Sequence, residues 1–378
     1  MSQRKNFARR YTRALWFLMP AMALASPAFA QSLDPRLADQ STPGSVIVFP
    51  KYVKGTVSVD GTPAEKTEIE VGAVCPKGAS ASVCNENTPV KIRFHWVCPA
   101  SQDFSTKFIC KEEDFDVFTT VDPVGGGKLV FDPDGMTITG SAPVTVPPAP
   151  CPKGYLIGWV VDKDDRPIKF DGLIGDAVIR ASGTAVQAYR AITIQADPNL
   201  NTNDLIVTGT DPLLGTPTLV FDGGWGHYQE TSEPISGDVR YSNPNGPTTY
   251  VNSWLILMTL DVRSNQSNYP TEVGLDFYNE TERLVSTSTE FVCWEEVELS
   301  QIDPALTQAS MGSRKGVFVS GQAEKFPFVG IFDKAGPVTL LGLIQTNEGA
   351  QPWTADRSYI FQAFDNANPI ATTFVPFP

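Results

Sequence analysis

Short segments in which apolar and polar residues alternate recur along most of the chain. The clearest is residues 90–96, with the sequence VKIRFHW. A period of two places successive side chains on opposite faces, as a half-buried β-strand requires. Glycine, proline, asparagine and aspartate separate these segments, and the sequence holds 30 glycines and 31 prolines. The pattern predicts an all-β protein with strands at residues 45–50, 67–74, 90–97, 114–121, 155–161, 188–196, 218–221, 250–262, 272–278, 290–299, 316–320, 338–345 and 358–364.

Three segments differ from this alternation. Residues 173–180 and 305–311 have helical periodicity, and each predicts a helix of about two turns. Residues 254–258 (WLILM) are apolar without interruption. A strand with this composition is apolar on both faces, which predicts a central strand that is covered on both sides.

A second pattern is an internal repeat. A shift of 183 residues superposes segment 90–113 on segment 273–296 with eight identities and no gap. Alternation accounts for the apolar matches, but not for Ser-Thr-x-Phe-x-Cys-x-Glu-Glu recurring in register. A shift of 184 also places residues 156–158 on 340–342. The repeat predicts two related β-sandwiches of the immunoglobulin-like class, at residues 45–210 and 216–378.

The first 30 residues have the features of an export signal. Five basic residues and no acid lie in residues 1–13, an apolar stretch follows, and Ala28-Phe29-Ala30 fits the small-x-small cleavage rule. We expect residues 1–30 to be removed and residues 31–44 to form a linker. The alternative, an uncleaved membrane anchor, is disfavoured by Pro20 and Pro27. No later apolar run is long enough to predict a membrane span, so the expected location is the periplasm, cell surface or extracellular space.

The charge of the chain excludes one class of partner. The net charge is −13, and removal of the basic first 30 residues makes it −18. A surface this acidic repels the phosphates of nucleic acids and anionic lipids. Nucleic acid is therefore not an expected partner.

The cysteine count predicts disulfide bonds. An even number of cysteines in an oxidising compartment favours a disulfide-stabilised fold. Short spacing favours Cys75–Cys84 and Cys98–Cys110, which leaves Cys151–Cys293 as a long-range link. A zinc site is the weaker alternative, because the chain has no C-x-x-C motif. All six cysteines follow the predicted signal: Cys75, Cys84, Cys98, Cys110, Cys151 and Cys293.

Four segments carry a resemblance to known proteins. They are VIVFPK (46–51), GLIGDA (172–177), FYNETE (277–282) and STSTEFVCW (286–294). Together they resemble a group of uncharacterised exported bacterial proteins, which are β-rich and surface-associated or secreted. The resemblance implies an exported bacterial protein, and it implies no activity or site residue.

No complete catalytic motif occurs in the sequence. The chain lacks G-x-S-x-G, H-E-x-x-H, a P-loop and a complete G-x-G-x-x-G. Its two histidines are His95 and His227, and alternation beside Phe94 predicts that His95 is a solvated strand residue. Acid pairs for glycoside hydrolysis remain open at residues 112–113 and 295–296. We expect a protein that is not an enzyme.

Two loops are candidate binding sites. In residues 221–230 three glycines free the backbone, and aromatic faces beside a carboxylate are typical of sugar binding. The residues predicted to bind there are Trp225, His227, Tyr228 and Glu230. The alternative is a glycine-flanked turn that buries Trp225 in a core.

The second loop, residues 197–204, begins with oxygen donors at alternate positions, like the first half of a calcium loop. Thr202 and Thr208 replace the glycine and glutamate expected later in such a loop, so an asparagine-rich turn is the alternative. The proposed calcium ligands are Asp197, Asn199, Asn201 and Asp204. Calcium is the only cofactor that the sequence suggests.

These observations predict an exported, non-catalytic protein that acts in binding or structure outside the cytoplasm. Its expected partner is an extracellular protein or a polysaccharide. One alternative is a carbohydrate-binding or carbohydrate-active protein that uses residues 221–230. Another is a surface-layer or fibre subunit that self-assembles through exposed strand edges.

Overall fold

The structure of the chain is a computed structural model. Almost all of its regular structure is β-strand, which confirms the predicted all-β class. The two helices, α1 (Leu299–Ile302) and α2 (Gln308–Met311), have four residues each. The structure describes residues 38, 40–55, 65–79, 84–86, 88–102, 108–122, 129–135, 137–139, 146–181, 186–196, 209–210, 217–243, 250–260, 270–325, 336–349, 355–360, 362–370 and 372–376. The predicted signal, residues 1–30, lies outside these residues.

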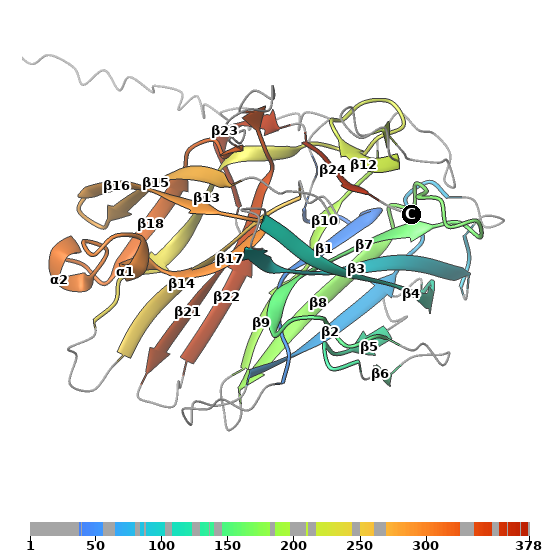
Figure 1. Ribbon diagram of the computed structural model, residues 1–378, viewed down its shortest axis with the longest axis horizontal. Coiled ribbons are helices and arrows are strands. Elements are labelled where there is room, and N and C mark those ends of the chain that lie inside the picture. The colour runs from blue at the N-terminus through green and yellow to red at the C-terminus, as the bar shows by residue number, and fades with distance from the viewer. Residues whose placement is uncertain are drawn as a thin grey trace, which may run out of the picture. The chain divides into compact units, whose positions relative to one another are not determined.

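Two five-stranded antiparallel sheets form from the first half of the chain (Figure 1). One follows the order β10-β1-β7-β3-β4 and the other the order β6-β5-β2-β8-β9. Their strands are β1 (Val46–Val53), β2 (Glu65–Ala73), β3 (Pro89–Gln102), β4 (Phe108–Thr120), β5 (Leu129–Phe131), β6 (Thr137–Thr139), β7 (Lys153–Val161), β8 (Leu173–Ala181), β9 (Val186–Arg190) and β10 (Ile192–Ile194).

The second half of the chain forms two further sheets. The larger follows the order β20-β19-β15-β18-β13-β23, with β16 also paired to β15, and the smaller follows β17-β14-β21-β22. A small sheet, β11-β12-β24, joins both ends of this half. The strands are β11 (Gly209–Thr210), β12 (Pro217–Phe221), β13 (Thr231–Arg240), β14 (Tyr250–Thr259), β15 (Thr271–Asn279), β16 (Leu284–Phe291), β17 (Trp294–Glu298), β18 (Lys315–Ser320), β19 (Glu324–Lys325), β20 (Gly336–Pro337), β21 (Leu340–Gly349), β22 (Ala355–Ile360), β23 (Gln362–Ile370) and β24 (Thr372–Pro376).

The two halves pair their strands by the same scheme. β1 pairs with β7 and β10, and β13 pairs with β18 and β23. β3 lies between β7 and β4, as β15 lies between β18 and β16. β2 lies between β5 and β8, as β14 lies between β17 and β21. Successive strands of one half therefore have counterparts, in the same chain order, in the other half.

The 183-residue shift follows this scheme only in part. It places β3 on β15, which have the same position in the two schemes. Phe94 pairs with Phe115 across the next ladder, whereas Phe277 pairs with Val285. The partner strands of β3 and β15, which are β4 and β16, therefore do not superpose under the 183-residue shift. The second match, of residues 156–158 with 340–342, joins strands β7 and β21, which have different positions in the pairing.

One predicted helix is a strand. Residues 173–180 lie in β8, which pairs with β2 along its whole length. Its side chains are buried with a period of two, at Leu173, Ala177 and Ile179. The sequence has apolar residues at spacings that suit both periods, and pairing with β2 decides between them. The other predicted helix is reduced to the four residues of α2.

Apolar residues pack in two clusters, and β14 contributes to both. Leu255 and Leu257 pack with the second half of the chain, whereas Ile256 and Met258 pack with the first. This confirms the predicted strand that is covered on both faces. Each fully buried aliphatic side chain stabilises the fold by about 1.5–3 kcal/mol, so β14 is a major link between the halves. Neither helix among the described residues is long and apolar enough to cross a membrane.

The disulfide pairing differs from the prediction at two of three bonds. Cys75–Cys84 is confirmed, with 5.7 Å between Cα atoms. The others are Cys98–Cys151 (5.8 Å) and Cys110–Cys293 (6.4 Å), so both remaining predicted bonds are wrong.

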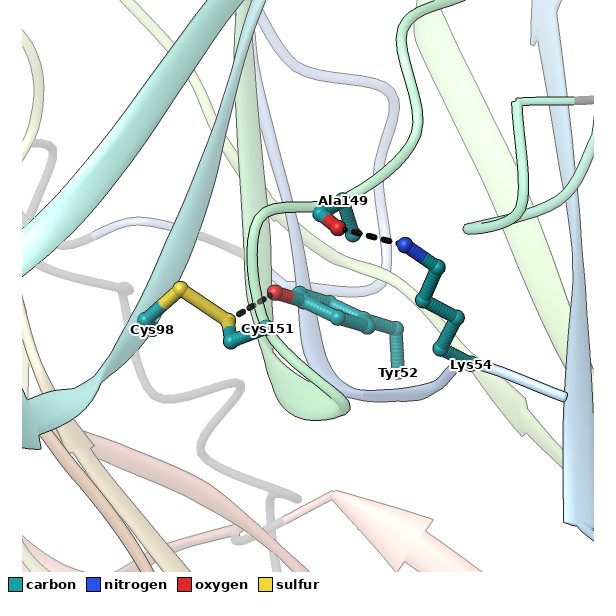
Figure 2. The surroundings of a disulfide bond; sticks show 5 residues. All are labelled: Tyr52, Lys54, Cys98, Ala149 and Cys151. Atoms are coloured by element: carbon teal, nitrogen blue, oxygen red, sulfur yellow. Dashed lines mark hydrogen bonds between the residues drawn. A yellow bond between two sulfur atoms is a disulfide. The ribbon is translucent and has the colours of Figure 1, made fainter. Parts of the chain in front are cut away.

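The reason for the difference is the register of β3 and β4. Val97 lies opposite Glu112 and, beyond a β-bulge, Ala100 lies opposite Cys110, so Cys98 does not face Cys110. Cys98 instead reaches Cys151, just before β7. Figure 2 shows this bond with the Tyr52 hydroxyl group 2.8 Å from the sulfur of Cys151. Beside it, the Lys54 ammonium group donates a 2.9 Å hydrogen bond to the carbonyl oxygen of Ala149.

Candidate functional site

A cavity of about 490 Å³ lies between the end of β3 and the bend that joins β16 to β17. Its lining combines apolar and aromatic side chains with three glutamates. The lining residues are Pro99, Ala100, Pro270, Glu290, Phe291, Val292, Trp294, Glu295 and Glu296. We call this cavity the acidic cleft.

The bend moves the chain from one sheet to another within two residues. β16 pairs with β15, and β17 pairs with β14 in a different sheet. Cys293 has a left-handed φ of 64°, which is uncommon for a residue other than glycine. The backbone N–H of Trp294 donates a 2.7 Å hydrogen bond to the carbonyl oxygen of Val292. The disulfide to Cys110 holds this bend against β4.

Trp294 and Glu296 fix the floor of the cleft to the first half of the chain. The indole N–H of Trp294 donates a 2.7 Å hydrogen bond to the carbonyl oxygen of Pro50. The Lys51 ammonium group is fully buried, and it donates to Glu296 Oε1 at 2.6 Å and to Gln345 Oε1. Lys153 donates to the other oxygen of Glu296, also at 2.6 Å. Glu296 thus joins two lysines.

Burial alone raises the pKa of Glu296, but the two ammonium groups outweigh burial and lower the pKa to about 2. Glu296 is therefore ionised at every physiological pH, and its charge is balanced by Lys51 and Lys153.

Glu295 has the opposite environment. As the neighbour of Glu296 on a strand, it points to the other face of β17. Burial raises the pKa of Glu295 above its ordinary value. Its Oε2 atom is buried and accepts no hydrogen bond within the described part of the chain. Glu290, at the rim, is exposed. The cleft thus offers Glu295 and Glu290 as acceptors beside aromatic rings, which suits a cationic group with an apolar stem.

The predicted binding loop does not bring its four residues together. Trp225 is 78% exposed, which contradicts a buried role for it. Tyr228 is fully buried and stacks on Phe221 with 5.2 Å between ring centroids. Glu230 is also buried. The side chain of His227 is partly exposed, and its Nδ1 lies 2.7 Å from Asp222 Oδ1.

Three other sequence predictions concern the calcium loop, the adjacent acid pairs and His95. Residues 197–204, the candidate calcium loop, lie outside the part of the chain that the structure describes. The acids of each adjacent pair, residues 112–113 and 295–296, occupy successive positions of one strand and so point to opposite faces. His95 is buried, not solvated, and its ring centroid lies 4.5 Å from that of Trp159 on the neighbouring strand β7.

The sequence pointed to residues 295–296 but not to the cleft as a whole. Pro99 and Pro270 reach it from distant parts of the chain, and no local pattern marks them. The sequence signal that could have located the cleft is the recurrence of cysteine at positions 110 and 293 under the 183-residue shift, since both residues lie beside the cleft. Comparison with known protein families and with curated proteins finds no match to this chain.

Proposed function

We propose that this chain is an exported, non-catalytic binding protein that takes an extended, basic polypeptide segment along β16 and into the acidic cleft. The observation that carries the proposal is the continuity of an exposed edge strand with a cavity lined by three glutamates. Three disulfides and no free cysteine among the described residues support a location outside the cytoplasm.

β16 has the properties of an edge that accepts another strand. It pairs with β15 on one side, and no described strand pairs with its other side. Its residues alternate between exposed and half-buried positions up to Phe291. Natural edge strands are usually protected by charges, prolines or bulges. β16 has the sequence LVSTSTEF, in which Glu290 is the single charge. By contrast, the edge strand β4 carries four acids.

The cleft supplies specificity at the end of this edge. Strand addition gives affinity through main-chain hydrogen bonds, and side-chain pockets give specificity. A segment paired with β16 reaches the cleft at Glu290 and Phe291, where a lysine or arginine side chain meets Glu295. The net charge of −18 expected for the mature chain attracts a basic partner over longer distances and is screened by salt.

The test is binding of two labelled ten-residue peptides, one alternating lysine with valine and one alternating glutamate with valine. Fluorescence polarisation with the oxidised chain is expected to detect the lysine peptide only, more weakly at high salt. Glu290→Lys is expected to weaken binding at least about tenfold, since it replaces attraction by repulsion.

Glu324→Lys is the matched control, because it makes the same charge change at an exposed position outside the cleft. Equal binding of the two peptides, or equal loss in both variants, contradicts the proposal. Concentration-dependent oligomers that Ser288→Lys abolishes would indicate self-assembly through β16 instead.

A second function, carbohydrate binding, is favoured by the exposure of Trp225. An indole ring that stands out of a glycine-rich turn offers a flat face to a sugar ring. Affinity electrophoresis through gels containing pooled polysaccharides is expected to retard the chain, and Trp225→Ala is expected to restore its mobility. Unchanged retardation in this variant, or none in the original chain, rules out this role for Trp225.

We also propose that the two halves arose by duplication of one β-sandwich. The shared pairing scheme and the match of β3 with β15 support this origin. Because the neighbouring strands β4 and β16 do not superpose under the 183-residue shift, the halves have diverged in loop and strand length. Their assignment to the immunoglobulin-like class stays a prediction.

A further inference from the structure

The outer face of β3 and β4 gathers a histidine and two carboxylates. His95 lies directly opposite Asp114 in the ladder, and Val97 lies opposite Glu112. Because side chains two apart on a strand share a face, Glu112, Asp114 and His95 point to the same side. One nitrogen of His95 and one oxygen of each carboxylate all lie within 4.8 Å of one another.

His95 is the unusual member of this cluster. Its side chain is 1% exposed, and neither ring nitrogen makes a hydrogen bond to any described residue. Nδ1 lies 3.8 Å from Glu112 and Nε2 lies 3.2 Å from Asp114. A buried polar atom without a partner costs about 1–3 kcal/mol. Each edge of the buried ring therefore faces a carboxylate.

The cations of this face make their direct contacts with other carboxylates, although the charge of Arg93 also acts on Asp114. Arg93 makes two hydrogen bonds to Asp116, of 2.8 and 3.1 Å, and Lys91 lies 2.9 Å from the same carboxylate. Both also approach Asp165. Among the described side chains, no lysine or arginine comes within 4.0 Å of Asp114. The negative charge beside His95 is therefore not neutralised by a direct lysine or arginine contact at Asp114.

We propose that His95, Glu112 and Asp114 form a binding site for a divalent transition-metal ion of the Zn²⁺ type. An ion at this point gives the buried imidazole a partner and adds positive charge beside Asp114. A nitrogen donor favours zinc or a similar ion over calcium, which takes oxygen ligands. The proposal is independent of the peptide function, because the ligands lie on β3 and β4 and none of them lines the acidic cleft.

The cluster needs a modest contraction to hold the ion. Metal–ligand distances of about 2.0–2.2 Å place neighbouring ligand atoms of a tetrahedron roughly 3.4 Å apart. Nε2 and Asp114 Oδ1 are already at 3.2 Å. The Asp114 side chain is 43% exposed, so it is able to rotate, and its exposure leaves an approach for the ion and a water as fourth ligand.

The test is titration of the oxidised full chain with ZnCl₂, followed by isothermal calorimetry. We expect one ion per chain and an affinity loss of at least about tenfold in Asp114→Asn, since even partners of metal ligands contribute 10–100-fold. Glu113→Gln is the matched control, because it removes the neighbouring charge on the opposite face of β4. The disulfides leave no described thiol to compete for the metal.

A second readout identifies the histidine. Co²⁺ in the site is expected to give visible absorption bands that His95→Gln abolishes. If His95→Gln fails to fold by circular dichroism, Asp114→Asn and Glu112→Gln in the same Co²⁺ titration decide the question. Failure of Zn²⁺ to bind, or equal affinity in Asp114→Asn and Glu113→Gln, overturns the proposal.

Discussion

At the scale of single residues, the buried charge of Lys51 requires hydrogen-bond acceptors in the interior. Its ammonium group is buried completely, and the charge is tolerated because Glu296 and Gln345 accept its hydrogen bonds. A buried ion pair is weak evidence for net stability, but loss of one partner leaves the other charge uncompensated. Glu296 therefore has a larger effect on stability than its partly open position suggests.

Glu296→Gln is expected to destabilise the fold by up to about 3–5 kcal/mol, because the buried Lys51 then keeps only the more distant carboxylate of Glu65, at 3.9 Å, as a counter-charge. Urea unfolding monitored by tryptophan fluorescence measures this change. Glu290→Gln makes the same charge change at the exposed rim and is expected to cost less than about 0.5 kcal/mol. Equal midpoints for the two variants would show that Glu296 does not stabilise the buried lysine.

The same pair sets a pH dependence. The pKa of Glu296 in the fold, about 2, is below its ordinary value of 4.5. The stability that ionised Glu296 gives the fold is therefore complete above pH 4.5. It is lost as the pH falls toward 2, because the carboxylate is then protonated in the folded as well as in the unfolded chain. Unfolding midpoints are expected to fall over this window in the original chain, and to fall less in Glu296→Gln.

At the scale of elements, local patterns located several strands and missed others. They located β1, β2, β15 and β18 to within a few residues, but not β5 or β13. The continuous apolar run in β14 correctly indicated cover on both sides. The local pattern predicted the wrong element where pairing with a strand distant in sequence determines the structure. Residues 173–180 suit a helix in isolation, but β2 offers them a complete ladder.

The candidate sites show the same limit more strongly. Residues 290–299 read as one strand, whereas the structure divides them into β16, the bend at Cys293, β17 and the first residue of α1. The acidic cleft exists because of that bend. His95 alternates with the core-facing Phe94 and Trp96 as predicted, yet it is buried, and its ring packs beside Trp159 of the distant strand β7. No pattern within residues 90–96 contains that information.

At the scale of the whole molecule, contacts in more than one region join the halves. Cys110–Cys293 links β4 to the bend after β16. The Glu296–Lys51 pair lies in the same region, and a 2.9 Å hydrogen bond joins Gln187 to Asn347 in another. Apolar side chains of β14 pack against the first half. The halves are therefore expected to unfold together in one transition.

Removal of each disulfide by paired Cys→Ser substitutions is expected to destabilise the chain in the order of loop length. The sequence separations are 183 for Cys110–Cys293, 53 for Cys98–Cys151 and 9 for Cys75–Cys84. By chain entropy alone, the longest loop contributes about 5 kcal/mol and the shortest about 2.5 kcal/mol. Urea unfolding of the three variants measures the order, and peptide mapping without reduction checks the pairing.

The Cys110–Cys293 variant also tests the cooperativity of the halves. This bond is the one disulfide among the described residues that joins them, so its loss removes a covalent link but leaves the packing of β14 and the buried Lys51 in place. If those contacts are sufficient, the variant unfolds at lower urea in a single transition. Two separate transitions would mean that each half is stable alone and that the disulfide is what couples them.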